Sequence, residues 1–269
     1  MNDRLLDDIN RNEPEDFQEN ITERPDYPFL EEADVPERDD LEELCARNVE
    51  TIDRRESTVV RFNLEEIKMH FEESMQGVEK EFEIADAMLE TKGLEYAEAV
   101  WKSQLLFLES AFDFFMHEFN KYALTNMYYE EWPATSNYLK INIPLKKVIE
   151  ALRVETQDAW FIEHVNDMYK TCTMVSSNGF KTEIKLWGLK YEDIAQILYP
   201  ELSVNDAKAN LSEHLDSLFE RRNYLVHQSN RKHEDATFYE AEISKEVVEG
   251  YISFIRNLID AIIECAVIL

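Results

Sequence analysis

The sequence has 269 residues, with 57 Asp and Glu against 28 Lys and Arg, and a formal net charge of -29. A chain of this length can bury a substantial core in one large domain or two modest ones. Nucleic-acid binders usually carry a broad basic face, and a chain this acidic is not expected to have such a face. Any contact with nucleic acid must therefore use a small local patch. With only 5 Gly and 7 Pro, and long apolar runs at helical spacing, the chain is predicted to be all-α.

Residues 1–60 are predicted to form an acidic N-terminal arm that is largely extended or disordered. Nearly half of the net negative charge lies there, and residues 1–40 contain four of the seven prolines and little apolar periodicity. A short helix is expected within residues 41–57. The first thirty residues are acidic and lack an apolar run, so no secretory signal is expected.

The folded domain is expected to span residues 61–269 and to begin with two long helices. Asn63 and Glu66 have the spacing of a capping box, which predicts a helix that starts here and ends at "TKG". A second helix is predicted from Leu94 to about Tyr129. It is apolar on nearly every face in "LLFLESAFDFFMHEF", so it is expected at the centre of a bundle, or in a bundle and a dimer interface.

Shorter elements are predicted after these two helices. The stretches "IPLKKVIEALRV" and "DAWFIEHVNDMYKTC" are expected to be helical, whereas "SSNGFKTEIKLWG" is predicted to be a small loop or hairpin insert because Asn178-Gly179 is a turn signal. A short helix, "YEDIAQILY", follows. A long helix capped by Ser203 or Asn205 then runs into "FERRNYLVHQ", and Ser244 caps the final helix.

Residues 219–235, "FERRNYLVHQSNRKHED", are the place where basic and imidazole groups gather. On a helix Asn223 and His227 lie four residues apart and share a face. Arg222 and His227 are five apart and diverge by about 140°. These two could converge on one phosphate if the helix frays at His227. They could also converge if the same motif of a second subunit faces the first across a twofold axis.

These residue types suit RNA cleavage without a metal. Histidine transfers protons near neutral pH and contributes about 10²–10⁴-fold to such reactions. Arginine binds phosphate oxygens in a planar, bidentate geometry, and the amide of Asn223 can orient an imidazole or bind a phosphate oxygen. Arg221 is either a second phosphate contact or the partner of Glu220 or Asp216 in a salt bridge.

The stretch "RRNYLVHQ" resembles the R-N-x-x-x-H signature of the HEPN superfamily of all-helical ribonucleases. Its context resembles that family too. "LLFLESAFDFFMHEF" is similar to the first long HEPN helix, with Glu109 and Asp113 as polar positions in an apolar run. "ISKEVVEGYISFIRNLIDAIIE" is similar to the helix that follows the motif and closes the bundle. The resemblance covers residues 64–269 and is strongest to RiboL-PSP-like and related stand-alone HEPN proteins of prokaryotic conflict systems.

The resemblance implies an antiparallel HEPN-like helical bundle that acts as a homodimer in the cytoplasm. It implies a metal-independent endoribonuclease, without a cofactor, that leaves 2′,3′-cyclic phosphate and 5′-OH ends on RNA. Arg222 would bind the scissile phosphate, His227 would be the general acid/base, and Asn223 would support them. Asp113 or Glu109 would contact the motif from the first helix. A toxin–antitoxin or antiviral defence role is implied as well, with an antitoxin or regulatory protein as a partner.

The alternative is a catalytically inactive binding module with the same fold. Arg222 and His227 facing each other across a dimer cleft would favour the enzyme. The same residues bonded to core carboxylates within a monomer would favour the module. The aromatic run "FDFFMHEF" is predicted to pack in the core or in a dimer interface rather than to stack on bases, so His117 is predicted to be a partly buried structural histidine.

Several other classes of protein are excluded because their motifs do not occur. The sequence has no HExxH, ExxH, GxxxxGK[ST], GxGxxG or GxSxG pattern, so neither a metal site nor a nucleotide cofactor is expected. Cys45, Cys172 and Cys265 form no CxxC pair and suit a reducing cytoplasm. In the apolar C-terminal stretch, Arg256 and Asp260 interrupt one side, which predicts a buried amphipathic helix rather than a membrane span.

Overall fold

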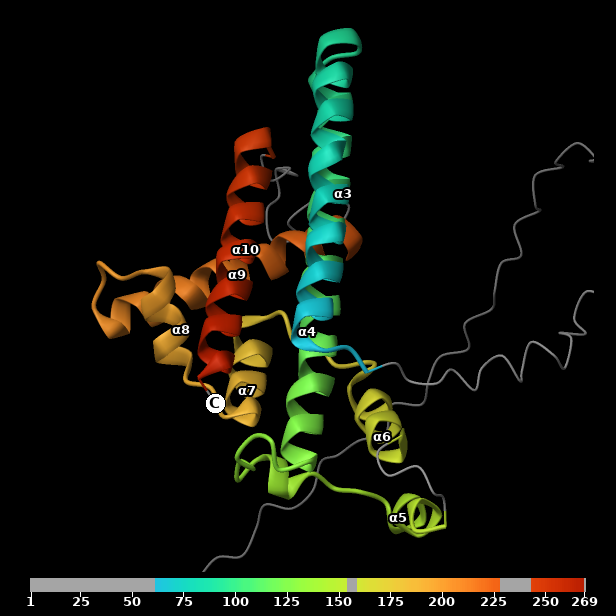
Figure 1. Cartoon of the computed structure of the whole chain (residues 1–269). Coiled ribbons are helices and arrows are strands. Elements are labelled where there is room, and N and C mark those ends of the chain that lie inside the picture. The colour runs from blue at the N-terminus through green and yellow to red at the C-terminus, as the bar shows by residue number, and fades with distance from the viewer. Residues whose placement is uncertain (1–60, 154–158, 228–242, 269) are drawn as a thin grey trace, which may run out of the picture. The chain divides into compact units, whose positions relative to one another are not determined.

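The computed structural model describes residues 61–153, 159–227 and 243–268, and the predicted acidic arm of residues 1–60 lies outside these ranges. The described residues form helices and loops, with no strand (Figure 1), which confirms the all-α prediction. Among the described helices, none combines the length and apolar character that a membrane span requires.

Two long helices, α3 (Leu64–Thr91) and α4 (Leu94–Tyr128), pack side by side (Figure 1). The capping box at the start of α3 is present, since the backbone N–H of Glu66 donates to Asn63 Oδ1 at 2.9 Å and the backbone N–H of Asn63 donates to Glu66 Oε2 at 2.8 Å. Gly93 joins the two helices with φ of 102°, a conformation that favours glycine. The predicted ends of both helices are thus confirmed to within a residue or two.

The remaining helices follow in chain order: η1 (Tyr138–Lys140), α5 (Leu145–Ala151), α6 (Ala159–Tyr169), α7 (Ser177–Trp187), α8 (Tyr191–Leu198), α9 (Val204–His227) and α10 (Lys245–Val267). Two predicted caps are confirmed. The hydroxyl of Ser203 accepts from the backbone N–H of Asp206 at 3.3 Å at the start of α9. The hydroxyl of Ser244 accepts from Val247 in the same way at the start of α10.

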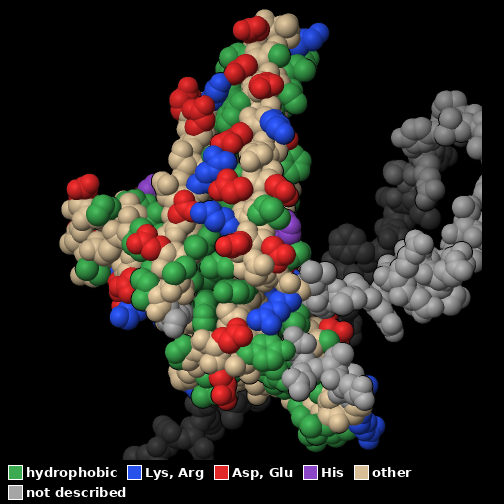
Figure 2. Space-filling view, viewed as in Figure 1, with side chains coloured by type: hydrophobic (Ala, Val, Ile, Leu, Met, Phe, Trp, Pro, Cys, Tyr) green, Lys and Arg blue, Asp and Glu red, His purple; other side chains and the backbone are tan. Residues whose placement is uncertain are grey.

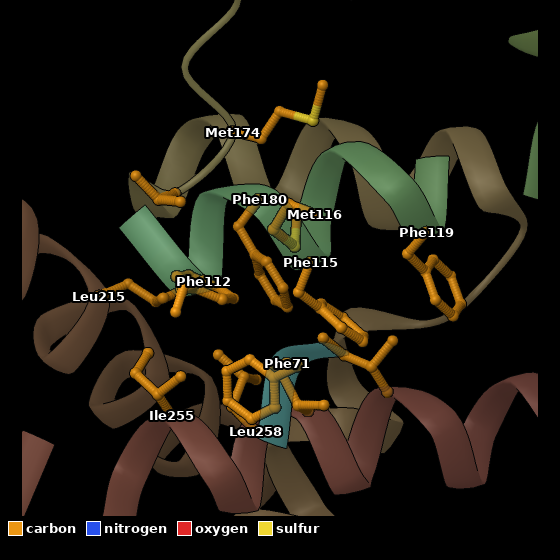
Figure 3. Packing of buried hydrophobic residues seen from close by; sticks show 14 of the residues in the cluster. Phe71, Phe112, Phe115, Met116, Phe119, Met174, Phe180, Leu215, Ile255 and Leu258 are labelled. Carbon is orange, nitrogen blue, oxygen red and sulfur yellow. The ribbon is translucent and has the colours of Figure 1, made fainter. Parts of the chain in front are cut away.

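The helix α4 lies at the centre of the described bundle, where it packs against α3, α6, α7, α9 and α10. Its aromatic side chains Phe112, Phe115 and Phe119 are fully buried. Figure 3 shows them among apolar side chains from the surrounding helices, including Phe71 of α3 and Leu215 of α9. This confirms the prediction that the apolar run of this helix lies in the core of a bundle.

The prediction of a loop or hairpin insert is wrong, because "SNGFKTEIKLW" forms the helix α7. The hydroxyl of Ser176 caps this helix by accepting from the backbone N–H of Gly179 at 3.2 Å. Phe180, Ile184 and Trp187 recur at helical spacing and are fully buried. The Asn-Gly dipeptide therefore lies in a first helical turn, where the burial of an amphipathic face outweighs the local preference for a turn.

The final helix, α10, is amphipathic as predicted. Ile255 and Ile259 are buried, whereas Arg256 lies toward α3 and forms ion pairs with Glu72 and Glu79. Figure 2 shows acidic and basic side chains interspersed over the described surface that faces the viewer. Pairs of this kind offset part of the excess acidic charge where two helices meet.

Candidate functional site

A surface groove of about 360 Å³ lies where α4 meets α9 and the segment between α6 and α7. We call it the Arg222 groove. Its lining residues are Leu106, Glu109, Ser110, Asp113 and His117 of α4, Lys170, Thr171, Cys172, Thr173 and Val175 after α6, and Arg222 and Val226 of α9. Three of the residues predicted from the sequence, Glu109, Asp113 and Arg222, therefore line one groove, although 113 positions separate Glu109 from Arg222 along the chain.

The guanidinium of Arg222 is held by a buried carboxyl group. Its Nε atom lies 2.7 Å from Oε2 of Glu109, and the Glu109 residue is only 5% exposed. A terminal nitrogen of Arg222 donates to Oδ1 of the adjacent Asn223 at 3.2 Å. These contacts fix the direction in which the guanidinium points, while the Arg222 side chain keeps 35% of its surface exposed to the groove and solvent.

Two carboxyl groups on one face of α4 share the charge of Arg222. Burial raises the pKa of Glu109 to about 7; the nearby Arg222 opposes this shift, and Asp113 adds to it. Burial also raises the pKa of Asp113, against the opposing effects of His117 and Arg222. Near neutral pH the groove thus contains a carboxyl group that is poised to gain or lose a proton.

His117 belongs to the groove, which the sequence analysis missed. Its Nε2 atom lies 3.5 Å from Oδ2 of Asp113, and its side chain is 23% exposed. The prediction of a partly buried histidine is confirmed, but the ring also lines the groove. The signal in the sequence was the spacing of Glu109, Asp113 and His117, which recur every four residues and so share one face of a helix.

The segment between α6 and α7 forms the opposite wall of the groove and is tied down at both ends. At its start, Lys170 forms an ion pair with Asp167 at 3.4 Å. At its end, Asp216 of α9 accepts hydrogen bonds from the backbone N–H of Ser177 at 3.0 Å and from the Ser177 hydroxyl at 2.7 Å. Lys170 adds a second cation to the groove beside Arg222.

Arg221 does not line the Arg222 groove. It lies on another face of α9, in a separate depression of about 340 Å³ that Asp216, Glu220 and Tyr251 also line. Both carboxylates that the sequence offered as salt-bridge partners of Arg221 therefore lie in the same depression as its side chain. A phosphate contact by Arg221 and its salt bridge to Glu220 or Asp216 both stay predictions.

His227 is the last residue of α9, and its side chain lies outside what the structure describes, as do residues 228–242. The helical backbone continues from Arg222 to His227. Val226 follows Arg222 by four residues and lines the same groove, whereas position 227 is rotated by about 140° from Arg222. The convergence of Arg222 and His227 on one phosphate stays a prediction.

Within the described ranges, no three His, Cys, Asp or Glu side chains gather in a way that would hold a metal ion. Comparisons of the chain with models of protein families, with curated proteins and with solved structures found no match. The HEPN resemblance therefore rests on the motif and the helices of this chain.

Proposed function

We propose that this protein is a metal-independent endoribonuclease of the HEPN type, with Arg222 and His227 as its central residues. The observation that carries the proposal is the placement of Arg222. Its guanidinium is fixed 2.7 Å from buried Glu109 at the edge of a groove that also contains an imidazole and a second cation. A fixed, partly exposed arginine is well suited to bind a phosphate through two parallel hydrogen bonds.

The reaction needs three groups. A base takes the proton of the ribose 2′-OH, the 2′-oxygen then bonds to phosphorus, and the bond from phosphorus to the 5′-oxygen breaks as an acid protonates that oxygen. The products are a 2′,3′-cyclic phosphate and a 5′-OH. Arg222 offsets the charge that develops on the phosphate, Asn223 supports it, and His227 serves in proton transfer.

The wider proposal includes the family's architecture and biology. The described helices would form an antiparallel HEPN-like bundle, with the acidic arm before it, and two copies would form a homodimer. Because Arg222 and His227 diverge on one straight helix, a twofold axis beside α9 would bring His227 of one copy to the Arg222 groove of the other. Fraying of α9 at His227 is the other way in which the two residues could converge. The protein would cleave RNA in the cytoplasm as a toxin or antiviral effector. An antitoxin or regulatory protein would inhibit it.

One observation favours a second candidate, a binding module without activity. Arg222 is paired with Glu109 inside a single chain, and this carboxyl occupies one side of the guanidinium that a phosphate would use. A module of this kind would use the Arg222 groove to hold an anionic group of a partner without cleaving it. The two candidates differ in whether His227 is needed for a chemical change in RNA.

The test is cleavage of total RNA in EDTA by the wild-type protein and by His227→Ala and Arg222→Ala. His214→Ala is the matched control, because His214 is an exposed histidine of the same helix. We expect the wild type and the control to cut alike, and both site variants to lose about 10²–10⁴-fold in rate. The product ends should carry cyclic phosphate.

Two results would contradict the enzyme. Equal cutting by the wild type and by His227→Ala would place the activity elsewhere. No cutting by the wild type, together with RNA binding that is lost in Arg222→Ala but kept in His227→Ala, would favour the binding module.

A further inference from the structure

We propose that His117, oriented by Asp113, is the general acid of the Arg222 groove and protonates the 5′-oxygen that leaves the scissile phosphate. This inference rests on the proposed function and adds a catalytic residue that lies outside the R-N-x-x-x-H motif. It gives the groove the second proton-transfer group that cleavage by a 2′-oxygen needs, with His227 as the base.

The geometry of α9 is the first argument. Arg222 and Val226 lie four residues apart and both line the groove, so they form the face of α9 that is turned toward it. The next position, 227, is rotated by about 140° from Arg222 and by about 100° from Val226. Among the described residues, the imidazole that shares the groove with Arg222 in the same chain is that of His117.

The pairing of His117 with Asp113 is the second argument. The carboxylate of Asp113 lies 3.5 Å from Nε2 of the imidazole, on the same face of α4. A carboxylate beside an imidazole can orient the ring. In the proposed step Asp113 orients the ring, and the other ring nitrogen of His117 is directed away from Asp113 toward the leaving oxygen.

The spacing along α4 is the third argument. Glu109, which holds Arg222, and His117 are eight residues apart, or about 12 Å along the helix axis. The guanidinium and the imidazole would lean toward each other across the groove and approach one phosphodiester from opposite ends. The remaining charged groups that face this stretch are Lys170 and the carboxyls of Glu109 and Asp113, so the cations Arg222 and Lys170 would bracket the phosphate.

The proposed cleavage step moves one proton to His227 and one proton from His117. His227 takes the proton of the 2′-OH, and the 2′-oxygen forms a bond to phosphorus. The bond from phosphorus to the 5′-oxygen breaks, and this oxygen takes its pair of electrons and a proton from His117. The enzyme is left with a protonated His227 and a neutral His117, and proton exchange with water restores both. Asp113 is a positioning residue and takes no part in the proton transfer.

The test compares two short oligoribonucleotides with one cleavage site. In the first the leaving atom is oxygen; in the second sulfur replaces the bridging 5′-oxygen. A thiolate leaves without protonation, so the second substrate needs no acid. We expect His117→Ala to cut the oxygen substrate about 10²–10⁴-fold more slowly than the wild type but the sulfur substrate within a few fold of it. His227→Ala should be slow on both, because the base is missing.

Two conservative variants separate a role in proton transfer from a purely structural role. His117→Gln should behave as His117→Ala on both substrates, and each should melt near the wild-type temperature. Asp113→Asn should slow cleavage of the oxygen substrate more than cleavage of the sulfur substrate, because the acid loses the carboxylate that orients its ring. Glu109, Lys170 and Arg222 face the same space and remain in all three variants.

The possible failures are distinguishable. If the wild type cuts neither substrate, the proposed function and the acid role fall together. If the wild type cuts both and His117→Ala matches it on the oxygen substrate, the inference alone is overturned. Equal slowing of His117→Ala on both substrates would likewise overturn it, since that pattern marks a structural role.

Discussion

Asp216 of α9 accepts both the backbone N–H and the hydroxyl of Ser177, at 3.0 Å and 2.7 Å, and so ties the first turn of α7 to α9. Ser177 is buried, and the residues just before it form one wall of the Arg222 groove. The position of that wall therefore depends on a single carboxylate of the same helix that carries Arg222.

Replacing Asp216 by Ala should destabilise the protein and displace this wall. The buried N–H and hydroxyl of Ser177 would lose their acceptor, at a cost of about 1–3 kcal/mol. Chemical denaturation would measure the change in the free energy of unfolding. Glu213→Ala, which removes an exposed carboxylate from the same helix, is the control and should have little effect. Equal stability of the two variants would contradict the anchoring role of Asp216.

Gly179 of α7 should not tolerate a side chain. An added Cβ would lie 2.6 Å from the backbone oxygen of Thr173 and 3.1 Å from Cα of Met174, so backbone would have to move. We expect Gly179→Ala to cost about 1–3 kcal/mol in thermal or chemical unfolding. The same substitution at Gly250 meets open space in an exposed turn of α10 and should stabilise by about 0.5–1 kcal/mol. Changes of the same sign and size at both sites would argue against this packing.

The buried carboxyl group of Glu183 should make stability fall as pH rises. Burial raises the pKa of Glu183 from its ordinary value of 4.5 to about 7, and among the described residues its Oε2 atom has no hydrogen-bond partner. Because the folded state holds the proton more tightly than the unfolded state, the stabilisation is complete below pH 4.5 and is lost as pH rises through about 7.

Glu183→Gln should therefore flatten the pH dependence of the free energy of unfolding. The variant should be more stable than the wild type at pH 9 by up to about 3 kcal/mol, with little difference at pH 4. Urea unfolding at a series of pH values would measure it, with Glu192→Gln on the exposed face of α8 as the control. An unchanged slope in Glu183→Gln would contradict the burial of an ionisable group at this position.

Removal of Arg222 should raise the pKa of Glu109 above its value of about 7. Arg222 is the group that lowers this pKa against the effect of burial. Carboxyl ¹³C NMR would follow the titration of Glu109 in Arg222→Ala and in the control Arg221→Ala, whose side chain lies in another depression. The control should leave the titration as it is. A titration that is unchanged in Arg222→Ala would show that the 2.7 Å pair does not persist in solution.

Long helices with clear caps could be predicted from the sequence alone. The capping box of Asn63 and Glu66 and the apolar periodicity after it place α3, and Ser203 and Ser244 place the starts of α9 and α10. These signals are local, so they need no knowledge of the neighbours. The helix α7 could not be predicted in this way. Asn178-Gly179 favours a turn locally, and this preference is outweighed only because the aromatic residues that follow are buried in the core.

The candidate site was predictable only in part, for the same reason. Glu109 and Asp113 stand out as acids in an apolar helix, but His117 follows them in a run that packs on nearly every side. Whether such a histidine faces the core or a groove depends on the elements that cover the helix. The spacing of four residues places His117 on the same face of α4 as Glu109 and Asp113. That this face stays open depends on the segment after Lys170 and the end of α9, which lie far away in the sequence.

The pair of Glu109 and Arg222 also bears on how an anion would bind. A free arginine side chain loses about 2 kcal/mol of rotamer entropy when it is immobilised. In this protein the buried carboxyl has already imposed that loss during folding, since it holds Nε while much of the guanidinium still faces the groove. An incoming phosphate would therefore meet a receptor that is already ordered, and its affinity would depend more on enthalpy than on the freezing of a mobile side chain.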